Sequence, residues 1–129
     1  AVSQLRMNLR REKRTPATVA DWMAEVGNPV LFDRGDYASY LPRWRERYPD
    51  MLILPFGRIA RDPGAVMDQV EAYLGIGPFP YMNLRQKVFA SPEGLNPPPE
   101  AIEALNRRLQ PQLDFLADHM GEAFTAEIR

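Results

Sequence analysis

Apolar side chains recur at steps of three and four residues over five stretches of the chain, which is the spacing of one face of an α-helix. The stretches are residues 1–13, 15–28, 37–48, 62–75 and 102–120. Pro111 interrupts the last stretch, so we expect either one kinked helix or two helices in register there. The pattern therefore predicts a largely helical chain.

Prolines, glycines and short polar residues mark the ends of two of these helices. The predicted caps, first-turn prolines and stops are Thr15, Pro16 and Gly27 for the second helix, and Asp62, Pro63 and Gly75 for the fourth. Asp33 and Asp36 lie in a turn, where we also expect them to cap helix ends. Pro42 is awkward inside the third helix because it lacks a backbone N–H.

Residues 51–54, Met-Leu-Ile-Leu, form a short continuous apolar run after the break at Pro49. Such a run is typical of a buried strand in an α/β sheet, with Pro55 at its end. One strand cannot form a sheet alone. Ala1 also lies within a helical pattern. We therefore expect an α/β fold and a longer native chain that supplies the remaining strands.

Residues 76–99 show no periodicity and contain six prolines. Loops longer than about 12–15 residues within a compact domain are frequently functional. We therefore treat this proline-rich loop as a candidate binding element.

Composition narrows the possible functions of the 129 residues. The chain has no cysteine and a single histidine, His119, so disulfides, thiol catalysis and a His/Cys metal site are excluded, and we predict no metal. The formal net charge is −1, which disfavours nucleic acid as a partner. There is no apolar run long enough for a membrane span, so we predict a cytoplasmic protein.

The order of several residues resembles the C-terminal part of the PAPS-dependent sulfotransferases, PAPS being 3′-phosphoadenosine 5′-phosphosulfate. The matching positions are Gly35, Tyr37, Leu41, Trp44, Tyr48, Pro49, Leu52, Ile53, Leu54, Asp62, Pro63, Val66, Val70, Tyr73, Leu74 and Gly75. The segment from Pro98 to Gly121 is similar to the closing helices of that family. The resemblance implies a P-loop-like three-layer α/β domain, of which this chain is the C-terminal portion.

The resemblance also implies a function and site residues. The parent protein would move a sulfuryl group from PAPS to an alcohol or amine of a small-molecule or carbohydrate acceptor. Ser3 matches the serine that holds the 3′-phosphate of the donor, and Arg85 and Lys87 are the cations of the loop that covers it. Tyr37 and Arg10 are the candidates for the acceptor side.

The sequence departs from the family in two places. It has no Gly-rich loop bearing a lysine, so we expect the 129 residues alone to lack transferase activity and assign no catalytic residue. Gly57-Arg58-Ile59 replaces the acidic turn that relatives show after the strand, which changes the expected turn geometry.

Several residues have a structural interpretation beside the functional one. Tyr37, Tyr40 and Trp44 suit a helical core, although Tyr37 also opens its helix near the expected acceptor. The basic run from Arg6 to Arg14 suits a solvated helix face or a rim that attracts anions. The rival functions are a non-enzymatic helical interaction module, which would use loop 76–99 and this basic helix, and a degenerate sulfotransferase-like protein.

Overall fold

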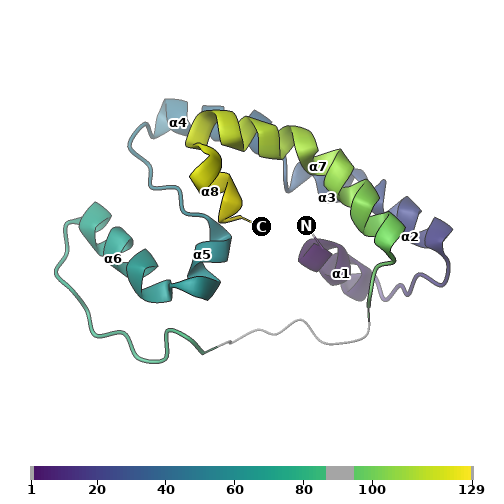
Figure 1. The fold of residues 1–129 in the computed structure, drawn as a ribbon, viewed down its shortest axis with the longest axis horizontal. Helices are drawn as coiled ribbons and strands as arrows, with labels where there is room; N and C mark the ends of the chain where they lie inside the picture. The colour runs from purple at the N-terminus through teal and green to yellow at the C-terminus, as the bar shows by residue number, and fades with distance from the viewer. Residues whose placement is uncertain (1, 87–94, 129) are drawn as a thin grey trace. The chain divides into compact units, whose positions relative to one another are not determined.

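The computed structural model describes residues 2–86 and 95–128, and in these ranges the chain forms eight helices (Figure 1). They are α1 (Val2–Arg11), α2 (Val19–Val26), α3 (Pro29–Asp33), α4 (Tyr37–Arg47), α5 (Phe56–Arg61), α6 (Pro63–Leu74), α7 (Pro99–Met120) and α8 (Glu122–Ala126).

The expected α/β three-layer fold is wrong for this structure, since the described residues contain no strand. Residues 51–55, where the buried strand was expected, are neither helical nor part of a sheet, and Leu52 is exposed. A strand is held by backbone hydrogen bonds from a neighbouring strand. The part of the chain that the structure describes supplies no such neighbour, and α5 begins immediately after the run, at Phe56.

The chain divides into two compact units. Unit 1 comprises Ala1–Ala38 and Phe89–Asp114, and unit 2 comprises Ser39–Val88 and Phe115–Arg129. We describe each unit separately.

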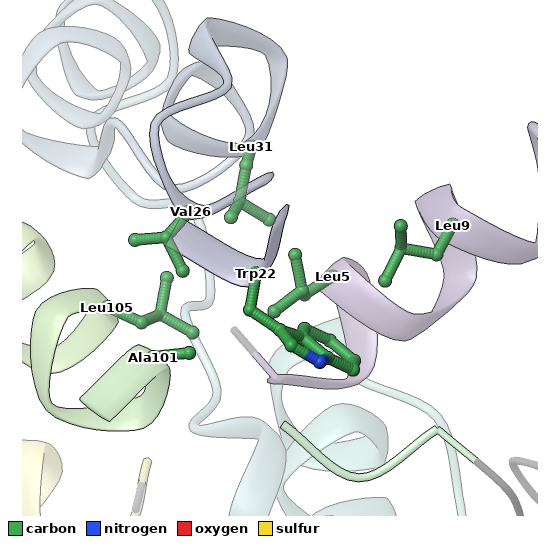
Figure 2. Packing of buried hydrophobic residues seen from close by; sticks show 7 residues of the cluster. All are labelled: Leu5, Leu9, Trp22, Val26, Leu31, Ala101 and Leu105. Atoms are coloured by element: carbon green, nitrogen blue, oxygen red, sulfur yellow. The ribbon is translucent and has the colours of Figure 1, made fainter. Parts of the chain in front are cut away.

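Unit 1 is built around one apolar cluster, to which four helices contribute (Figure 2). Its buried members are Leu5 and Leu9 of α1, Trp22 and Val26 of α2, Leu31 of α3, and Ala101 and Leu105 of α7. Burying a side chain of leucine size contributes about 1.5–3 kcal/mol. The helix face predicted for residues 1–13 is therefore confirmed, because Leu5 and Leu9 belong to this core. At the start of the stripe predicted for 102–120, Leu105 is buried in the core, whereas Ile102 is exposed.

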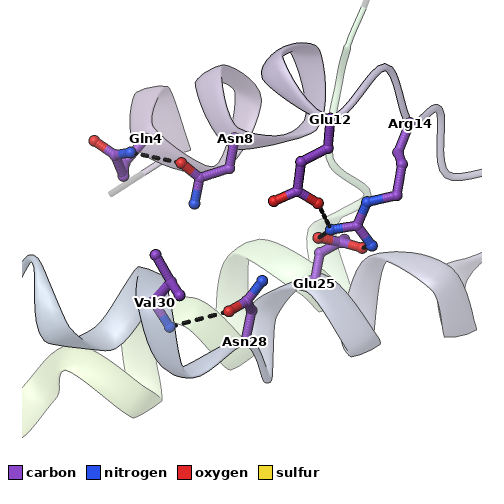
Figure 3. Close-up of polar contacts among 7 residues, drawn as sticks. All are labelled: Gln4, Asn8, Glu12, Arg14, Glu25, Asn28 and Val30. Atoms are coloured by element: carbon purple, nitrogen blue, oxygen red, sulfur yellow. Dashed lines mark hydrogen bonds and ion pairs between the residues drawn. The ribbon is translucent and has the colours of Figure 1, made fainter.

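An ion pair joins the segment that follows α1 to α2 (Figure 3). Arg14 forms a bidentate ion pair with Glu25, whose second contact joins Nη2 to Oε2 at 2.9 Å, and Arg14 also pairs with Glu12. Glu25 is only 7% exposed. A buried carboxylate is costly unless it is paired, so Arg14 makes the burial of Glu25 tolerable.

Helix α2 begins three residues later than the sequence pattern predicts. Thr18, not Thr15, is the N-cap: its hydroxyl accepts the Asp21 N–H, and the Asp21 carboxylate accepts the Thr18 N–H at 2.8 Å. This reciprocal capping box satisfies two backbone donors at once. Hydrogen bonds from the Thr18 backbone and hydroxyl and from the Ala17 backbone lower the pKa of Asp21.

Two polar side chains of α7 bind the end of α2, α3 and the start of α4. Arg108 donates to the carbonyl of Val26 at the end of α2, and its guanidinium lies 5.4 Å from the ring centre of Phe32. Gln112 donates to Asp36 at 3.1 Å and accepts the N–H of Ala38 at 2.8 Å. Asp36 is thus bound by Gln112, and Gln112 itself satisfies a backbone donor in the first turn of α4.

Unit 2 contains α4 from Ser39 onward, α5, α6, the end of α7 and α8. Helix α6 confirms the predicted signals: Asp62 caps Ala65 N–H at 3.2 Å, Pro63 occupies the first turn, and Gly75 ends the helix in the left-handed region at φ 66°. Pro111 lies inside α7 and Pro42 inside α4, so neither proline ends its helix.

Candidate functional site

Helix α1 exposes two of the residues that the sulfotransferase resemblance selects. Ser3 lies in its first turn and Arg10 about two turns further on, and both side chains are exposed. Leu5 and Leu9 anchor the buried side of the same helix in the core. The two selected residues therefore lie on one accessible side of an anchored helix.

The basic run that follows Ser3 is divided between structural and exposed side chains. Arg6 donates to the carbonyl of Leu95 at 2.7 Å and to Asn96 at 3.2 Å. Arg14 is occupied by Glu25 and Glu12, as described above. Arg10, Arg11 and Lys13 are exposed, and they form no ion pair among residues 2–86 and 95–128. The run is thus partly structural, and only these three cations fit a rim that attracts anions.

The other predicted site residues lie elsewhere. Tyr37 begins α4 and is exposed in unit 1, while Arg85 is exposed in a turn of unit 2. Lys87 lies outside the described residues. Ser3 and Arg85 belong to different units, so the joint phosphate contact of Ser3, Arg85 and Lys87 stays a prediction.

The core interpretation of the aromatic residues on α4 is wrong. The side chains of Tyr37, Tyr40 and Trp44 are exposed, and that of Trp44 is 56% exposed. A shallow hollow of about 320 Å³ runs along the helix in unit 2. Its lining residues, which we call the aromatic–arginine face, are Tyr40, Arg43, Trp44, Arg47 and Tyr48.

The sequence held a signal for this exposure. Arg43 and Arg47 interleave with the aromatic residues at steps of three and four, so they fall on the same side of the helix. A buried helix face rarely carries two arginines without partners. The aromatic rings also pack on each other: Trp44 and Tyr48 stack with ring centres 5.8 Å apart.

A different side of α4 contacts the end of α7. Nη2 of Arg45 lies 2.9 Å from Sδ of Met120, at the end of α7. In the described part of the chain, neither Arg43 nor Arg47 forms an ion pair. The guanidinium groups of the aromatic–arginine face are therefore available to a ligand.

The start of loop 76–99 is held on α6 by a buried carboxylate. Glu71 accepts the N–H of Phe79 at 2.8 Å and is 6% exposed. Desolvation, and secondly the hydrogen bond and charge of Glu71, raise the pKa of Tyr81. Phe79 and Tyr81 pack edge to face with ring centres 5.1 Å apart. The first residues of the loop are therefore tied to α6 through Glu71.

His119 has a structural environment. Its Nδ1 lies 2.8 Å from the carbonyl oxygen of Phe115. Its ring stacks on the ring of Phe115, with ring centres 4.0 Å apart. Within residues 2–86 and 95–128, no group of three or more His, Cys, Asp or Glu side chains is arranged to hold a metal ion. None of the helices in those ranges is long and apolar enough to cross a bilayer.

Neither a protein-family model, nor a curated protein, nor a solved structure matches the chain. The sulfotransferase resemblance therefore rests on the residues quoted for it.

Proposed function

We propose that this chain is part of a PAPS-dependent sulfotransferase and that α1 contributes to the donor site. The observation that carries the proposal is the placement of Ser3: its hydroxyl is exposed in the first turn of a helix whose opposite side is fixed by Leu5 and Leu9. The N-terminal turn of a helix favours anions, since its backbone N–H groups have no partner within the helix.

The proposed chemistry requires little covalent participation from these residues. Ser3 would donate a hydrogen bond to the 3′-phosphate, and Arg85 and Lys87 would add charge to the same group. Arg10 and Tyr37 would meet the acceptor alcohol or amine. Sulfuryl transfer needs in-line attack and stabilisation of charge on the leaving phosphate, and precise binding of the donor supplies the first requirement.

Binding of adenosine 3′,5′-bisphosphate, the product left by PAPS, tests this proposal without requiring turnover. Calorimetry on the 129-residue chain should detect binding of this nucleotide and much weaker binding of adenosine 5′-phosphate, which lacks the 3′-phosphate. Ser3→Ala and Lys87→Ala should each weaken binding by roughly tenfold, as expected for the loss of one charge-assisted hydrogen bond.

The matched control is Arg61→Ala, which removes an exposed cation of α5 that the proposal does not use. Its affinity for the bisphosphate should equal that of the unchanged chain. Circular dichroism should show that every variant keeps its helices. Failure of the folded chain to bind the bisphosphate, or equal binding of both nucleotides, would overturn the proposal.

A second candidate is a non-enzymatic interaction module, and the exposed apolar side chains of unit 2 favour it. Phe56 is 79% exposed and Met82 is 87% exposed. Exposed apolar side chains mark an interaction site where they form a contiguous patch, so the second candidate requires that such side chains of unit 2 act together. Tight binding of a protein together with indifference to the bisphosphate would support this function over the first. We place both candidates in the cytosol, in keeping with the absence of cysteine.

A further inference from the structure

We propose that the aromatic–arginine face of α4 is a docking surface for an acidic amphipathic helix of a protein partner. The face consists of Tyr40, Arg43, Trp44, Arg47 and Tyr48 in unit 2. This inference goes beyond donor binding and does not depend on it.

The face has the residue composition of a binding hot spot in a protein–protein interface. Tryptophan, tyrosine and arginine are the residues most enriched among interface positions that dominate binding energy. Here they border a single hollow, and the Trp44 and Tyr48 rings already stack. Their mutual packing reduces the side-chain entropy that a partner would have to remove on binding.

The spacing of the face indicates a helix as the occupant. The five residues follow steps of three, one, three and one, which gives a continuous stripe along one side of α4. From Tyr40 to Tyr48 the stripe is about 12 Å long, or slightly more than two helical turns. Ridges and grooves of this spacing are what a second helix packs against.

The charges of the face indicate an acidic occupant. Arg43 and Arg47 flank Trp44 and have no ion-pair partner among residues 2–86 and 95–128. Glu46, the carboxylate of α4 itself, lies on another side of the helix, about 130° from the middle of the stripe at 100° per residue. A partner with apolar side chains flanked by glutamates would therefore complement both features of the face.

A polyanion such as nucleic acid fits less well. The whole chain has a formal net charge of −1, and the face itself carries only two arginines. Nucleic-acid binding gains most of its energy from many cations that each neutralise a phosphate. Two arginines separated by a tryptophan suit a few carboxylates better than a uniform line of phosphates.

A pair of designed peptides tests the proposal on the full 129-residue chain. The first is a fluorescein-labelled 18-residue helix with leucines at helical spacing and flanking glutamates, and the second replaces every glutamate with lysine. Fluorescence anisotropy should show binding of the acidic peptide at least roughly tenfold tighter than the basic one, with affinity falling as salt rises.

Variants of the face identify the site. Trp44→Ala should weaken acidic-peptide binding by roughly tenfold or more, as for a central interface residue. The double change Arg43→Glu and Arg47→Glu should reverse the preference to the basic peptide. The control Arg58→Glu and Arg61→Glu, two cations of α5, should leave the preference unchanged.

Three results would overturn the proposal: equal affinity for both peptides, variants of the face that fold and bind as the unchanged chain does, or tighter binding of single-stranded DNA than of the acidic peptide. Affinity of Trp44→Ala for adenosine 3′,5′-bisphosphate should be unchanged. That measurement separates failure of this proposal from failure of the proposed donor site.

Discussion

The two units of this chain bury their apolar side chains very differently. Unit 1 encloses a cluster of seven buried apolar residues from four helices, whereas the buried aliphatic side chains of unit 2 within the described ranges are Val66 and Leu116. Of the 18 exposed large hydrophobic residues in those ranges, 12 belong to unit 2. Stability is therefore concentrated in unit 1, and apolar surface suited to binding is concentrated in unit 2.

The helices of unit 2 are held mainly by local signals. Asp62 and Gly75 define the ends of α6, and Glu71 fixes the segment that follows it. Such caps and hydrogen bonds contribute about 1 kcal/mol each, less than a buried core leucine. The contrast teaches that well-formed helices need not indicate a well-formed core.

The largest expected difference in stability is between two alanine substitutions, one in each unit. Leu105→Ala removes a side chain that is 1% exposed at the centre of unit 1, and should lower the free energy of unfolding by about 2–5 kcal/mol. Trp44→Ala removes a larger but exposed side chain, and should change the free energy of unfolding by no more than about 0.5 kcal/mol. Urea unfolding followed by circular dichroism measures both. Equal losses of stability in the two variants would contradict the difference in burial between the units.

The next effect concerns the charged edge of unit 1. Arg14→Ala leaves the buried Glu25 carboxylate without its ion pair, and should cost about 1–3 kcal/mol. Glu12→Gln is the control because it removes the other, exposed partner of Arg14, and its cost should stay below about 1 kcal/mol. Denaturant unfolding of the two variants should show this order, and the reverse order would mean that Glu25 is not buried as described.

The third effect depends on pH. The pKa of Asp21 is lowered in the folded state by hydrogen bonds from Thr18 and Ala17, so its ionised form stabilises α2. That stability is present above the ordinary pKa of 3.8 and is lost as pH falls through the lower folded value. Thr18→Ala should cost about 1 kcal/mol at pH 6.

An NMR titration of the Asp21 carboxyl checks the same capping box. The midpoint should lie below 3.8 in the unchanged chain and move up towards that value in Thr18→Ala. A midpoint that is the same in both proteins would contradict the capping arrangement.

The smallest effect is a stabilisation. Lys13 follows α1 with φ at 53°, a conformation that glycine adopts without the cost paid by other residues. Lys13→Gly should therefore raise the free energy of unfolding by up to about 1 kcal/mol. Arg11→Gly, at the last residue of α1, should instead lower it by about 0.5–1 kcal/mol. Urea unfolding measures both variants: the midpoint of Lys13→Gly should lie above that of the unchanged chain, and the midpoint of Arg11→Gly should lie below it.

Local signals in the sequence predicted the helices well. The face of α1, the face of α7 apart from the exposed Ile102, and both ends of α6 follow directly from apolar spacing and from Asp62, Pro63 and Gly75. Helices α3 and α5 were missed because they have only five and six residues, too few to show a period. The shift of the α2 cap to Thr18 depends on the reciprocal bond with Asp21, which the pattern Thr-x-x-Asp did contain.

Tertiary features were harder to predict. The run at residues 51–54 has the composition of a buried strand, but a strand exists only where another backbone pairs with it. The aromatic stripe of α4 has the period of a core face, yet Arg43 and Arg47 interrupt it and the face is exposed. The sulfotransferase resemblance selected Ser3 for the donor site and Arg10 and Tyr37 for the acceptor side, and the structure adds only that these three residues are exposed.

The two tryptophans provide the most direct test of the contrast between the units, since each unit contains one. Trp22 is 7% exposed in unit 1 and Trp44 is 56% exposed in unit 2. Acrylamide quenching of Trp22→Phe, which reports Trp44, and of Trp44→Phe, which reports Trp22, compares them. We predict strong quenching and red-shifted emission for Trp44, with weak quenching and blue-shifted emission for Trp22. Equal protection of both would contradict the account, because the face of α4 would then be buried.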